Sequence, residues 1–364
     1  MSSSITLFIG NLTIGGAEQV TVNLANQLVE NGHQVEVLVV TEQGKLINEL
    51  SSSIEFSVLP IDRMRWSVVP LACHLRRTQP DVVISFLTAA NVMTILAAQL
   101  SQVSSRIIVT EHSTQSETQA FSKKRDMILA KYTYSLADHV VGVSKGVSQD
   151  IRDWARISND KVSTIYNPVI SEEQFETVYA LPSHQWFHDD EIAVVLSVGR
   201  HVEAKDYPTL IRAFARLTEE RGDTRLLLLG GGKLTSEYES LAEQLEISEK
   251  VSMPGFVSDP YPYMAHSDVF ALSSQWEGLS LVLIEAMACG TPVVSTDCPN
   301  GPSEILMNGE YGDLTPVGDS EALKDALLRI LKDPIDPEKL QQRARYFSIR
   351  EATAQYEGLF ETVL

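Results

Sequence analysis

Two successive arrays of alternating strand and helix patterns limit the folds open to this chain more than any other feature of its sequence. Short apolar runs rich in branched residues alternate with stretches of helical spacing. Alternation of this kind predicts parallel sheets with helices on both faces, and hence an α/β fold of two Rossmann-like domains. The predicted strands are residues 5–9, 35–40, 82–86, 107–109 and 140–143 in the first array, and 193–198, 226–229, 251–253, 269–272 and 293–295 in the second.

The length of 364 residues also favours two domains, because single cores stop growing at about 250 to 300 residues. The pattern breaks after Pro168, where the sequence turns irregular and polar. Ligands of open parallel sheets bind beyond the carboxyl ends of the strands, so two facing domains are expected to share one cleft. The expected division is a first domain, a hinge or linker, a second domain and a C-terminal helix, over residues 1–170, 171–190, 191–344 and 345–364 respectively.

The cysteines and the N-terminus indicate a protein of the cytoplasm. Cys73, Cys289 and Cys298 are odd in number and lack a paired spacing, so the sequence indicates neither a disulfide framework nor a thiolate metal site. The N-terminus lacks the basic flank and long apolar stretch of a signal peptide. The longest apolar region, residues 86–100, is interrupted by polar residues and is shorter than the roughly 20 residues that span a bilayer. It predicts a buried helix.

The net charge of −19 is unevenly distributed. Residues 1–170 carry 14 Lys and Arg against 15 Asp and Glu, whereas residues 171–364 carry 15 against 33. An acidic surface repels nucleic acid and anionic lipid, so no nucleic-acid partner is expected and peripheral membrane contact is expected only through the first half. Two clusters there, residues 63–66 and 123–125, combine basic with apolar or aromatic side chains, although a solvated loop or helix face would also explain each.

Several glycines and cations occur where predicted strands end. Gly15 and Gly16 precede a helical pattern and can present backbone N–H groups to an anion, although a simple turn explains them equally well. Gly199 and Arg200 end a strand, with Lys205 shortly after, and such cations can neutralise a diphosphate that leaves with growing charge; a pair of surface cations is the alternative. Weaker candidates of the same kind follow two further strands, namely Gly231, Phe256 and Val257.

The segment from Glu277 to Glu285 is the strongest candidate site. A turn of small residues follows a predicted strand, and a helix is predicted from about Leu281 to Ala288, with Gly290 as its stop. A carboxylate can accept two hydrogen bonds from a sugar diol, and a glutamate in an otherwise apolar helix is costly to bury without a partner. At the start of the helix, backbone amides are expected to face a phosphate or sugar oxygen, those of Gly278, Leu279 and Ser280.

This segment resembles the E-x7-E signature of the glycosyl transferase group 1 family, retaining enzymes of the GT-B fold. The resemblance covers nearly the whole chain, because further family motifs occur in the family's order: Gly15-Gly16-Ala17-Glu18, Val143-Ser144, Asn167-Pro168, Val198-Gly199-Arg200, Lys205, Gly255-Phe256 and Val317-Gly318-Asp319. It implies that the first domain binds the acceptor, that the second binds a nucleotide sugar, and that the C-terminal helix packs on the first domain.

The resemblance also implies roles for individual residues. Glu277 corresponds to the glutamate that contacts the donor sugar, and Glu285 to the glutamate that holds the nucleotide ribose. Arg200 and Lys205 correspond to the cations that bind the donor diphosphate, while Gly15 and Gly16 form the glycine turn over the phosphate. His112 matches the family histidine beside the donor sugar; without the resemblance, a lone histidine would more often be structural.

The expected reaction is transfer of a hexose or N-acetylhexosamine, with retention, from a nucleotide-diphosphate sugar to a saccharide or a lipid-linked acceptor. No Asp-x-Asp motif occurs in the chain, so we expect neither a metal nor another cofactor, and the resemblance favours a UDP-sugar and bacterial polysaccharide biosynthesis. Three alternatives remain open at this stage: a sugar-nucleotide 2-epimerase of the same fold, a nicotinamide dehydrogenase that lacks its fingerprint, and a non-catalytic subunit that binds a nucleotide sugar.

Overall fold

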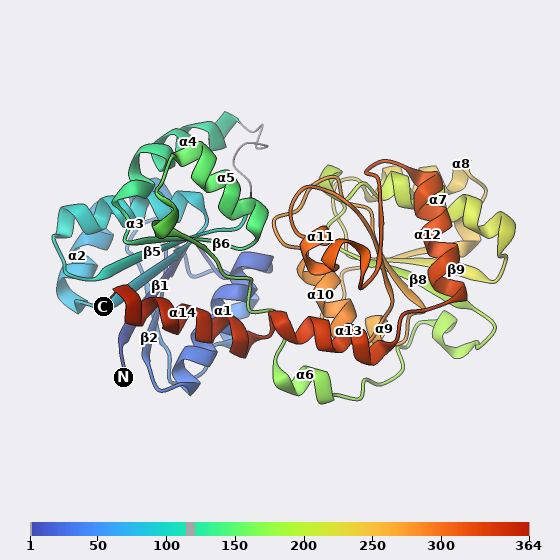
Figure 1. Ribbon diagram of the computed structural model, residues 1–364, viewed down its shortest axis with the longest axis horizontal. Coiled ribbons are helices and arrows are strands. Elements are labelled where there is room, and N and C mark those ends of the chain that lie inside the picture. The colour runs from blue at the N-terminus through green and yellow to red at the C-terminus, as the bar shows by residue number, and fades with distance from the viewer. Residues whose placement is uncertain (1, 114–120, 364) are drawn as a thin grey trace. The chain divides into compact units, whose positions relative to one another are not determined.

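The chain forms two compact units in the computed structural model, which describes residues 2–113 and 121–363 (Figure 1). The first unit contains the residues up to Val169 and those from Ile349 onward, and the second runs from Ile170 to Ser348. Each unit is built on one sheet in which every paired strand is parallel to its neighbours. The predicted α/β fold with two Rossmann-like domains is therefore confirmed.

The first unit has a seven-stranded sheet in the order β3-β2-β1-β4-β5-β6-β7. The five predicted strands are present with ends shifted by at most two residues. The third and seventh strands were not predicted, because both are short and only partly buried and so lack a continuous apolar run. The strands are β1 (Ser4–Ile9), β2 (Gln34–Val39), β3 (Glu55–Val58), β4 (Val82–Phe86), β5 (Arg106–Glu111), β6 (His139–Gly142) and β7 (Val162–Thr164).

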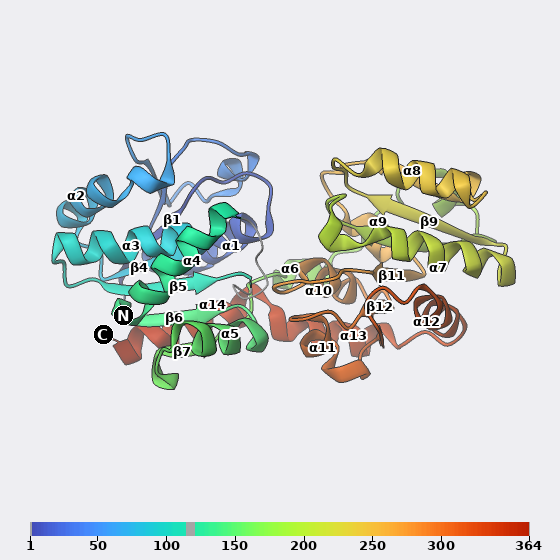
Figure 2. The same ribbon diagram turned by 90° about the horizontal axis from the view of Figure 1, so that it is seen from above.

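Helices cover the first sheet. The apolar region at residues 86–100 forms α3, which is largely buried as predicted and lies between α2 and α4 in the same layer (Figure 2). Among the described residues no helix combines the length and the apolar character needed to cross a bilayer. The elements are α1 (Gly16–Glu30), α2 (Val68–Thr78), α3 (Thr88–Ser101), α4 (Phe121–Thr133) and α5 (Lys145–Ala155), with short 3-10 turns η2 (Met64–Trp66) and η3 (Tyr134–Leu136).

The C-terminal helix α14 (Ile349–Val363) belongs to the first unit and packs on α1. Its Tyr356 and Phe360 are buried, and Glu357 accepts hydrogen bonds from Asn31 at 2.9 Å and lies 3.0 Å from His33 Nε2. The structure differs from the expected helix over residues 345–364 at its start. Residues Arg345–Phe347 form a separate 3-10 turn that belongs to the second unit, so the helix that returns to the first unit begins only after Ser348.

The second unit has a six-stranded sheet in the order β10-β9-β8-β11-β12-β13. All five predicted strands are present, and the additional edge strand β13 has only three residues. The strands are β8 (Ala193–Val198), β9 (Thr224–Leu229), β10 (Val251–Gly255), β11 (Val269–Leu272), β12 (Val293–Thr296) and β13 (Asp313–Thr315), and the helices are α6 (Glu172–Glu176), α7 (Tyr207–Glu220), α8 (Thr235–Gln244), α9 (Tyr261–Ala265), α10 (Leu281–Ala288), α11 (Pro302–Ile305), α12 (Ser320–Lys332) and α13 (Pro337–Ala344).

The segment expected to be a hinge or linker, residues 171–190, is part of the second unit. It contains α6, which begins with a capping box between Ser171 and Gln174, and a 3-10 turn in which Trp186 and Phe187 are buried. The polar composition of this segment led to the expectation of an irregular linker. Its two buried aromatic side chains instead attach it to the second unit.

Gly230, directly after β9, holds two strand ends in close contact. Its φ of +120° lies in a region that suits glycine, and a Cβ atom here would lie 2.0 Å from the carbonyl oxygen of Gly199 after β8. Gly222 provides a matched control, because a Cβ atom there would meet nothing within 4 Å.

We therefore expect Gly230→Ala to lower the free energy of unfolding of the second unit by about 1 to 3 kcal/mol, whereas Gly222→Ala leaves it nearly unchanged. Urea unfolding followed by tryptophan fluorescence measures both. Equal stability of the two variants would show that the contact between these strand ends is not constrained as the structure indicates.

Candidate donor-binding site

The predicted site residues of the second unit gather at one edge of its sheet. Because all paired strands are parallel, their carboxyl ends meet at the same edge. Gly199 and Arg200 follow β8 at this edge, and Gly231 follows β9. Phe256 and Val257 follow β10 there, and the turn that begins with Glu277 lies between β11 and α10. The sheet topology thus brings together residues that are up to 78 positions apart in the sequence, from Gly199 to Glu277.

An ion pair between Lys205 and Glu277 lies at the centre of this edge. Lys205 Nζ is 2.7 Å from Glu277 Oε1, and the two side chains are only 18% and 14% exposed. Ser274 Oγ donates to the same oxygen at 2.6 Å, and Ser273 Oγ donates to the backbone oxygen of Lys205 at 2.7 Å. Sequence reasoning assigned Lys205 to a diphosphate and Glu277 to a sugar separately, and missed both their pairing and the role of the two serines.

Glu277 retains one carboxylate oxygen for a ligand. All its hydrogen bonds and its ion pair within the described residues go to Oε1, and none goes to Oε2. The backbone N–H of Glu277 donates to the carbonyl oxygen of Pro299 at 3.3 Å, and this bond fixes the turn against the loop after β12. The carboxylate is therefore held in place on one side and able to accept a hydroxyl group on the other.

Glu285 lies on α10, between Ile284 and Ala286, and is partly buried. Its carboxylate makes no hydrogen bond or ion pair with any group in the described part of the chain. Burial raises the pKa of Glu285 to about 7, although the nearby Lys205 opposes the rise. A carboxylate in this position is costly to ionise without a partner, as the sequence had suggested.

Three consecutive backbone amides lie between the two glutamates in the sequence. In the described structure the N–H groups of Gly278, Leu279 and Ser280 donate to no protein acceptor, and the Ser280 side chain does not cap the helix. Ser280 Oγ is buried and also lacks a partner. Gly301 backs the turn, because a Cβ atom there would lie 3.3 Å from the Ser280 nitrogen. Free amides at a helix N-terminus form a binding site for an anion or a polar oxygen.

The remaining predicted residues of this unit differ in their setting. Arg200 is exposed, and its guanidinium has no ion pair within the described residues. Gly199 lies close to the core, since a Cβ atom there would be 3.0 Å from the Tyr207 hydroxyl. Phe256 is 61% exposed at the strand end, whereas a Cβ atom at Gly231 would meet nothing within 4 Å. An unpaired cation and an exposed aromatic ring are thus both present at this edge.

The predicted residues of the first unit also follow strand ends. Gly15 and Gly16 lie at the start of α1, which follows β1, and His112 directly follows β5. His112 Nε2 is buried and has no partner among the described residues, and its ring lies 6.0 Å from that of Phe86. Burial lowers the pKa of His112 to about 4, so the imidazole is neutral near pH 7 and either ring nitrogen can accept or donate according to its tautomer.

A buried polar network supports the strand end that carries His112. Glu111 is 1% exposed and accepts hydrogen bonds from the Tyr134 hydroxyl and from Thr88 Oγ1. Asn91 Nδ2 donates to the backbone oxygen of Thr110 at 2.9 Å, and Tyr356 of α14 lies 3.4 Å from Thr110 Oγ1. Sequence reasoning missed this network, although a glutamate at the end of an apolar strand was a visible signal.

Models of two related protein families match most of the chain. Residues 183–347 match the model of Glycosyl transferases group 1, and residues 14–173 match that of Glycosyltransferase Family 4. The first match contains every predicted donor-binding residue of the second unit. The second contains Gly15, Gly16 and His112.

Similar proteins of known name are enzymes that build glycans or glycosides. The chain is 29% identical over 344 residues, 90% of each chain, to the N-acetylgalactosamine-N,N'-diacetylbacillosaminyl-diphospho-undecaprenol 4-alpha-N-acetylgalactosaminyltransferase of Campylobacter jejuni. It is 24% identical to the N-acetyl-alpha-D-glucosaminyl L-malate synthase of Bacillus anthracis over 97% of this chain and 95% of that one. Among solved structures, Anabaena HepE in complex with UDP-glucose has a TM-score of 0.82 at 20% identity, covering 99% of this chain and all of HepE, which supports the GT-B fold.

The lack of a partner for Glu285 within the described residues leads to a prediction about the free energy of unfolding. The raised pKa of Glu285, about 7 against an ordinary 4.5, means that burial favours the protonated form of the folded protein. Its stabilising contribution is complete below about pH 4.5 and is lost as the pH rises through about 7. Glu285→Gln should therefore leave the free energy of unfolding unchanged near pH 4.5 but raise it by about 1 to 3 kcal/mol above pH 7.

Urea titrations of the ligand-free protein at several pH values measure this difference. Glu239→Gln is a matched control, because that glutamate lies on the exposed surface of α8 and forms no ion pair within the described residues. A Glu285→Gln variant whose stability follows that of the wild type at every pH would contradict the electrostatic account of the buried carboxyl group.

Proposed function

Because the chain belongs to the glycosyl transferases group 1 family, we propose that it is a retaining glycosyltransferase with a nucleotide-diphosphate sugar, a UDP-sugar, as its donor. The sugar is a hexose or N-acetylhexosamine, and the acceptor is a saccharide or lipid-linked saccharide of bacterial glycan biosynthesis. One observation carries the proposal: at the edge of a parallel sheet, two carboxylates flank three amides, and within the described residues the amides and at least one oxygen of each carboxylate have no protein partner.

Each part of this arrangement suits one part of the donor. The carboxylate of Glu285 accepts hydrogen bonds from the two ribose hydroxyls, and Oε2 of Glu277 accepts one from the transferred sugar. The amides of the turn bind sugar or phosphate oxygens. Phe256, exposed at the end of β10, packs against the flat base together with Val257, and Gly231 leaves space beside it.

Bond cleavage follows from the charges at this edge. As the bond between C1 of the sugar and the phosphate oxygen lengthens, negative charge accumulates on the leaving diphosphate. Arg200 and Lys205 stabilise that charge, and the family resemblance assigns the amides of the glycine turn at Gly15 and Gly16 to the same phosphate, so the transfer proceeds without a metal ion or other cofactor. A phosphate oxygen of the leaving group takes the proton of the acceptor hydroxyl, which attacks from the same face.

The family resemblance assigns His112 a supporting role beside the donor sugar. Its neutral imidazole, buried beside Phe86, offers one nitrogen to a hydroxyl group of the donor sugar. A neutral ring does not compete with the cations for the phosphate, and it can accept or donate a hydrogen bond without a change in charge. The role is one of positioning and polarisation near the sugar.

The choice of UDP and of the acceptor class is supported by similar proteins. The name of the Campylobacter jejuni enzyme specifies an acceptor on diphospho-undecaprenol, and HepE was crystallised with UDP and with UDP-glucose. The Bacillus anthracis enzyme is named for a small acid, L-malate, as its acceptor. A cytoplasmic protein that meets a lipid-linked acceptor at the membrane surface accords with the name of the Campylobacter jejuni enzyme.

Thermal unfolding in the presence of UDP, GDP, ADP and their sugars tests the donor assignment. We expect UDP and UDP-sugars to raise the Tm most, with the same rise when a chelator is present. Binding to the folded state alone stabilises it by about 2.7 kcal/mol at a hundredfold excess over Kd. Stabilisation that needs a divalent ion, or its absence with every nucleotide, would refute the donor assignment.

Two variants separate binding from transfer. Glu285→Ala should abolish the rise in Tm with UDP, whereas His112→Ala should keep it and lose the transfer of sugar from UDP-sugar to acceptor. Equal loss of nucleotide binding in both variants would contradict the separate roles. Product analysis completes the test, since release of a free epimerised sugar without an acceptor would indicate an epimerase.

A further inference from the structure

His201 connects the two loops that follow β8 and β9. It lies directly after Arg200 and four residues before Lys205 in the first of these loops. Its backbone N–H donates to the carbonyl oxygen of Gly231 at 2.9 Å, and its own carbonyl oxygen accepts from the N–H of Leu234 at 3.4 Å. Both partners belong to the loop between β9 and α8, so His201 joins two loops at the carboxyl edge of the sheet.

The two loops approach so closely that side chains would not fit between them. A Cβ atom at Gly232 would lie 2.5 Å from the carbonyl oxygen of His201 and 3.0 Å from its nitrogen. Gly230 makes a similar contact with the carbonyl oxygen of Gly199. The residues before and after Arg200 are therefore both held against the loop that follows β9.

The imidazole ring of His201 is fully buried, with 0% of the residue exposed. Its centroid lies 5.2 Å from that of Tyr207, nearly perpendicular to it, and 5.4 Å from that of Tyr238. The first tyrosine belongs to α7 and the second to α8. Edge-to-face contacts of aromatic rings stabilise one relative orientation, so the ring attaches its loop to both helices.

One hydrogen bond fixes the orientation of the imidazole. His201 Nδ1 is 2.8 Å from Thr235 Oγ1, and the same hydroxyl donates to the carbonyl oxygen of Gly232 at 2.8 Å. A hydroxyl group has a single proton to donate, so Nδ1 carries the ring proton and donates to Thr235. Nε2 is then the unprotonated nitrogen, and it has no partner among the described residues. Burial lowers the pKa of His201, which favours this neutral form.

The two cations of this loop differ in what holds them. Lys205 is paired with Glu277, and its backbone oxygen accepts from the Ser273 hydroxyl. Arg200 is exposed and has no ion pair within the described residues. Charge-assisted bonds to a phosphate need defined geometry, and a side chain without a protein partner depends on its backbone for that geometry. The buried side chain next to Arg200 is that of His201.

We propose that His201 is a positioning residue for Arg200: its buried ring and its hydrogen bond to Thr235 hold the loop so that the guanidinium meets the diphosphate of the donor. His201 does not touch the ligand and acts only through the loop. The inference rests on the proposed function, because it requires a nucleotide diphosphate at this edge of the sheet.

UDP and uridine distinguish the positioning of Arg200 from a general loss of structure. Both ligands contain the base and the ribose, but only UDP contains the diphosphate. His201→Leu replaces the ring with an apolar side chain and removes its hydrogen bond, so it should weaken UDP binding about five- to tenfold and leave uridine binding unchanged. Titration calorimetry measures UDP, and displacement of UDP measures uridine. Equal losses for the two ligands, or no loss for either, would overturn the proposal.

Two further variants change the hydrogen bond with less effect on packing. His201→Asn can place an amide N–H near the position of Nδ1, and should keep UDP binding within about threefold of the wild type. Thr235→Val removes the acceptor oxygen and should weaken UDP binding as His201→Leu does, again without loss of uridine binding. If His201→Asn binds UDP no better than His201→Leu, the hydrogen bond has no positioning role and the proposal fails.

His184→Leu is the matched control in the same unit. His184 also packs against aromatic rings, those of Trp186 and Phe187, and its Nε2 lies 3.2 Å from Ser252 Oγ. Ser252 is near the amino end of β10, at the opposite edge of the sheet from the donor-binding residues. The control should leave the binding of both ligands unchanged. A loss of UDP binding as large as that of His201→Leu would show that the effect is not local, against the proposal.

A double-mutant cycle shows whether His201 acts through Arg200. Arg200→Gln removes the guanidinium that binds the diphosphate, so it should itself weaken UDP binding. In that background His201→Leu should weaken UDP binding by less than about twofold further, because the side chain that it positions is gone. Full additivity of the two substitutions would contradict the positioning role.

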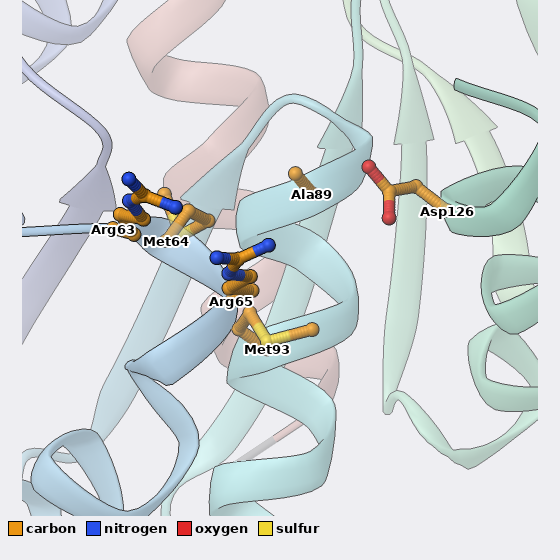
Figure 3. A pocket seen from close by; sticks show the side chains of 6 residues that line it. All are labelled: Arg63, Met64, Arg65, Ala89, Met93 and Asp126. Atoms are coloured by element: carbon orange, nitrogen blue, oxygen red, sulfur yellow. The ribbon is translucent and has the colours of Figure 1, made fainter. Parts of the chain in front are cut away.

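Arg65 provides the control cycle. It is an exposed arginine of the cluster at residues 63–66 in the first unit, where it lines a pocket of about 260 Å³ with Arg63 and Met93 (Figure 3). The other cluster that the sequence singled out, residues 123–125, has side chains outside the described residues. Arg65 shares no partner with His201 in the described structure, so Arg65→Gln and His201→Leu should be additive. Coupling as strong as that with Arg200 would overturn the proposal.

The wild type separates this inference from the donor assignment. If it binds neither UDP nor uridine, the proposed donor is wrong, and the role of His201 is refuted with it. If it binds UDP and the His201 variants lose UDP and uridine alike, the inference fails while the donor assignment stands. The expected result is selective loss of UDP binding, with rescue by His201→Asn.

Discussion

The ion pair between Lys205 and Glu277 organises the edge of the second sheet. It joins the loop after β8 to the turn after β11 across 72 positions of sequence, and two serine hydroxyls fix its two ends. Both side chains are largely removed from water, so the loss of one partner would leave an uncompensated charge. The position of the turn amides, and therefore of α10, depends on this contact.

The adjoining segment, residues 278–285, contains polar groups that lack hydrogen-bond partners in the described structure. Glu285 is partly buried without a hydrogen-bond partner, its pKa is raised to about 7 by burial, and the amides of Gly278 to Ser280 have no acceptor in the described structure. Natural proteins rarely leave so many polar groups unpaired in one turn. Such groups lower the stability of the free protein. They favour binding of a ligand whose hydroxyl and phosphate groups supply the missing hydrogen-bond partners.

Sequence patterns predicted much of this fold, because a strand buried on both faces and a helix with its stop signal have local signatures. The bounds Leu281–Ala288 of α10 agree with the prediction, and Gly290 ends the helix with a φ of +79°. Short edge strands such as Val162–Thr164 lack that signature. The pairing of Lys205 with Glu277 and the network around Glu111 depend on contacts between distant segments, which a single sequence does not encode locally.

The protons exchanged when UDP binds test the central claim, that Glu285 is a partly buried carboxyl group that receives the nucleotide. Titration calorimetry near pH 7 in buffers of different ionisation enthalpy measures this number. If ribose hydroxyls donate to the carboxylate, UDP favours its ionised form and lowers its pKa, so the wild type should release a fraction of a proton that Glu285→Gln does not release. Equal proton release by both proteins, or unchanged UDP affinity in the variant, would contradict the account.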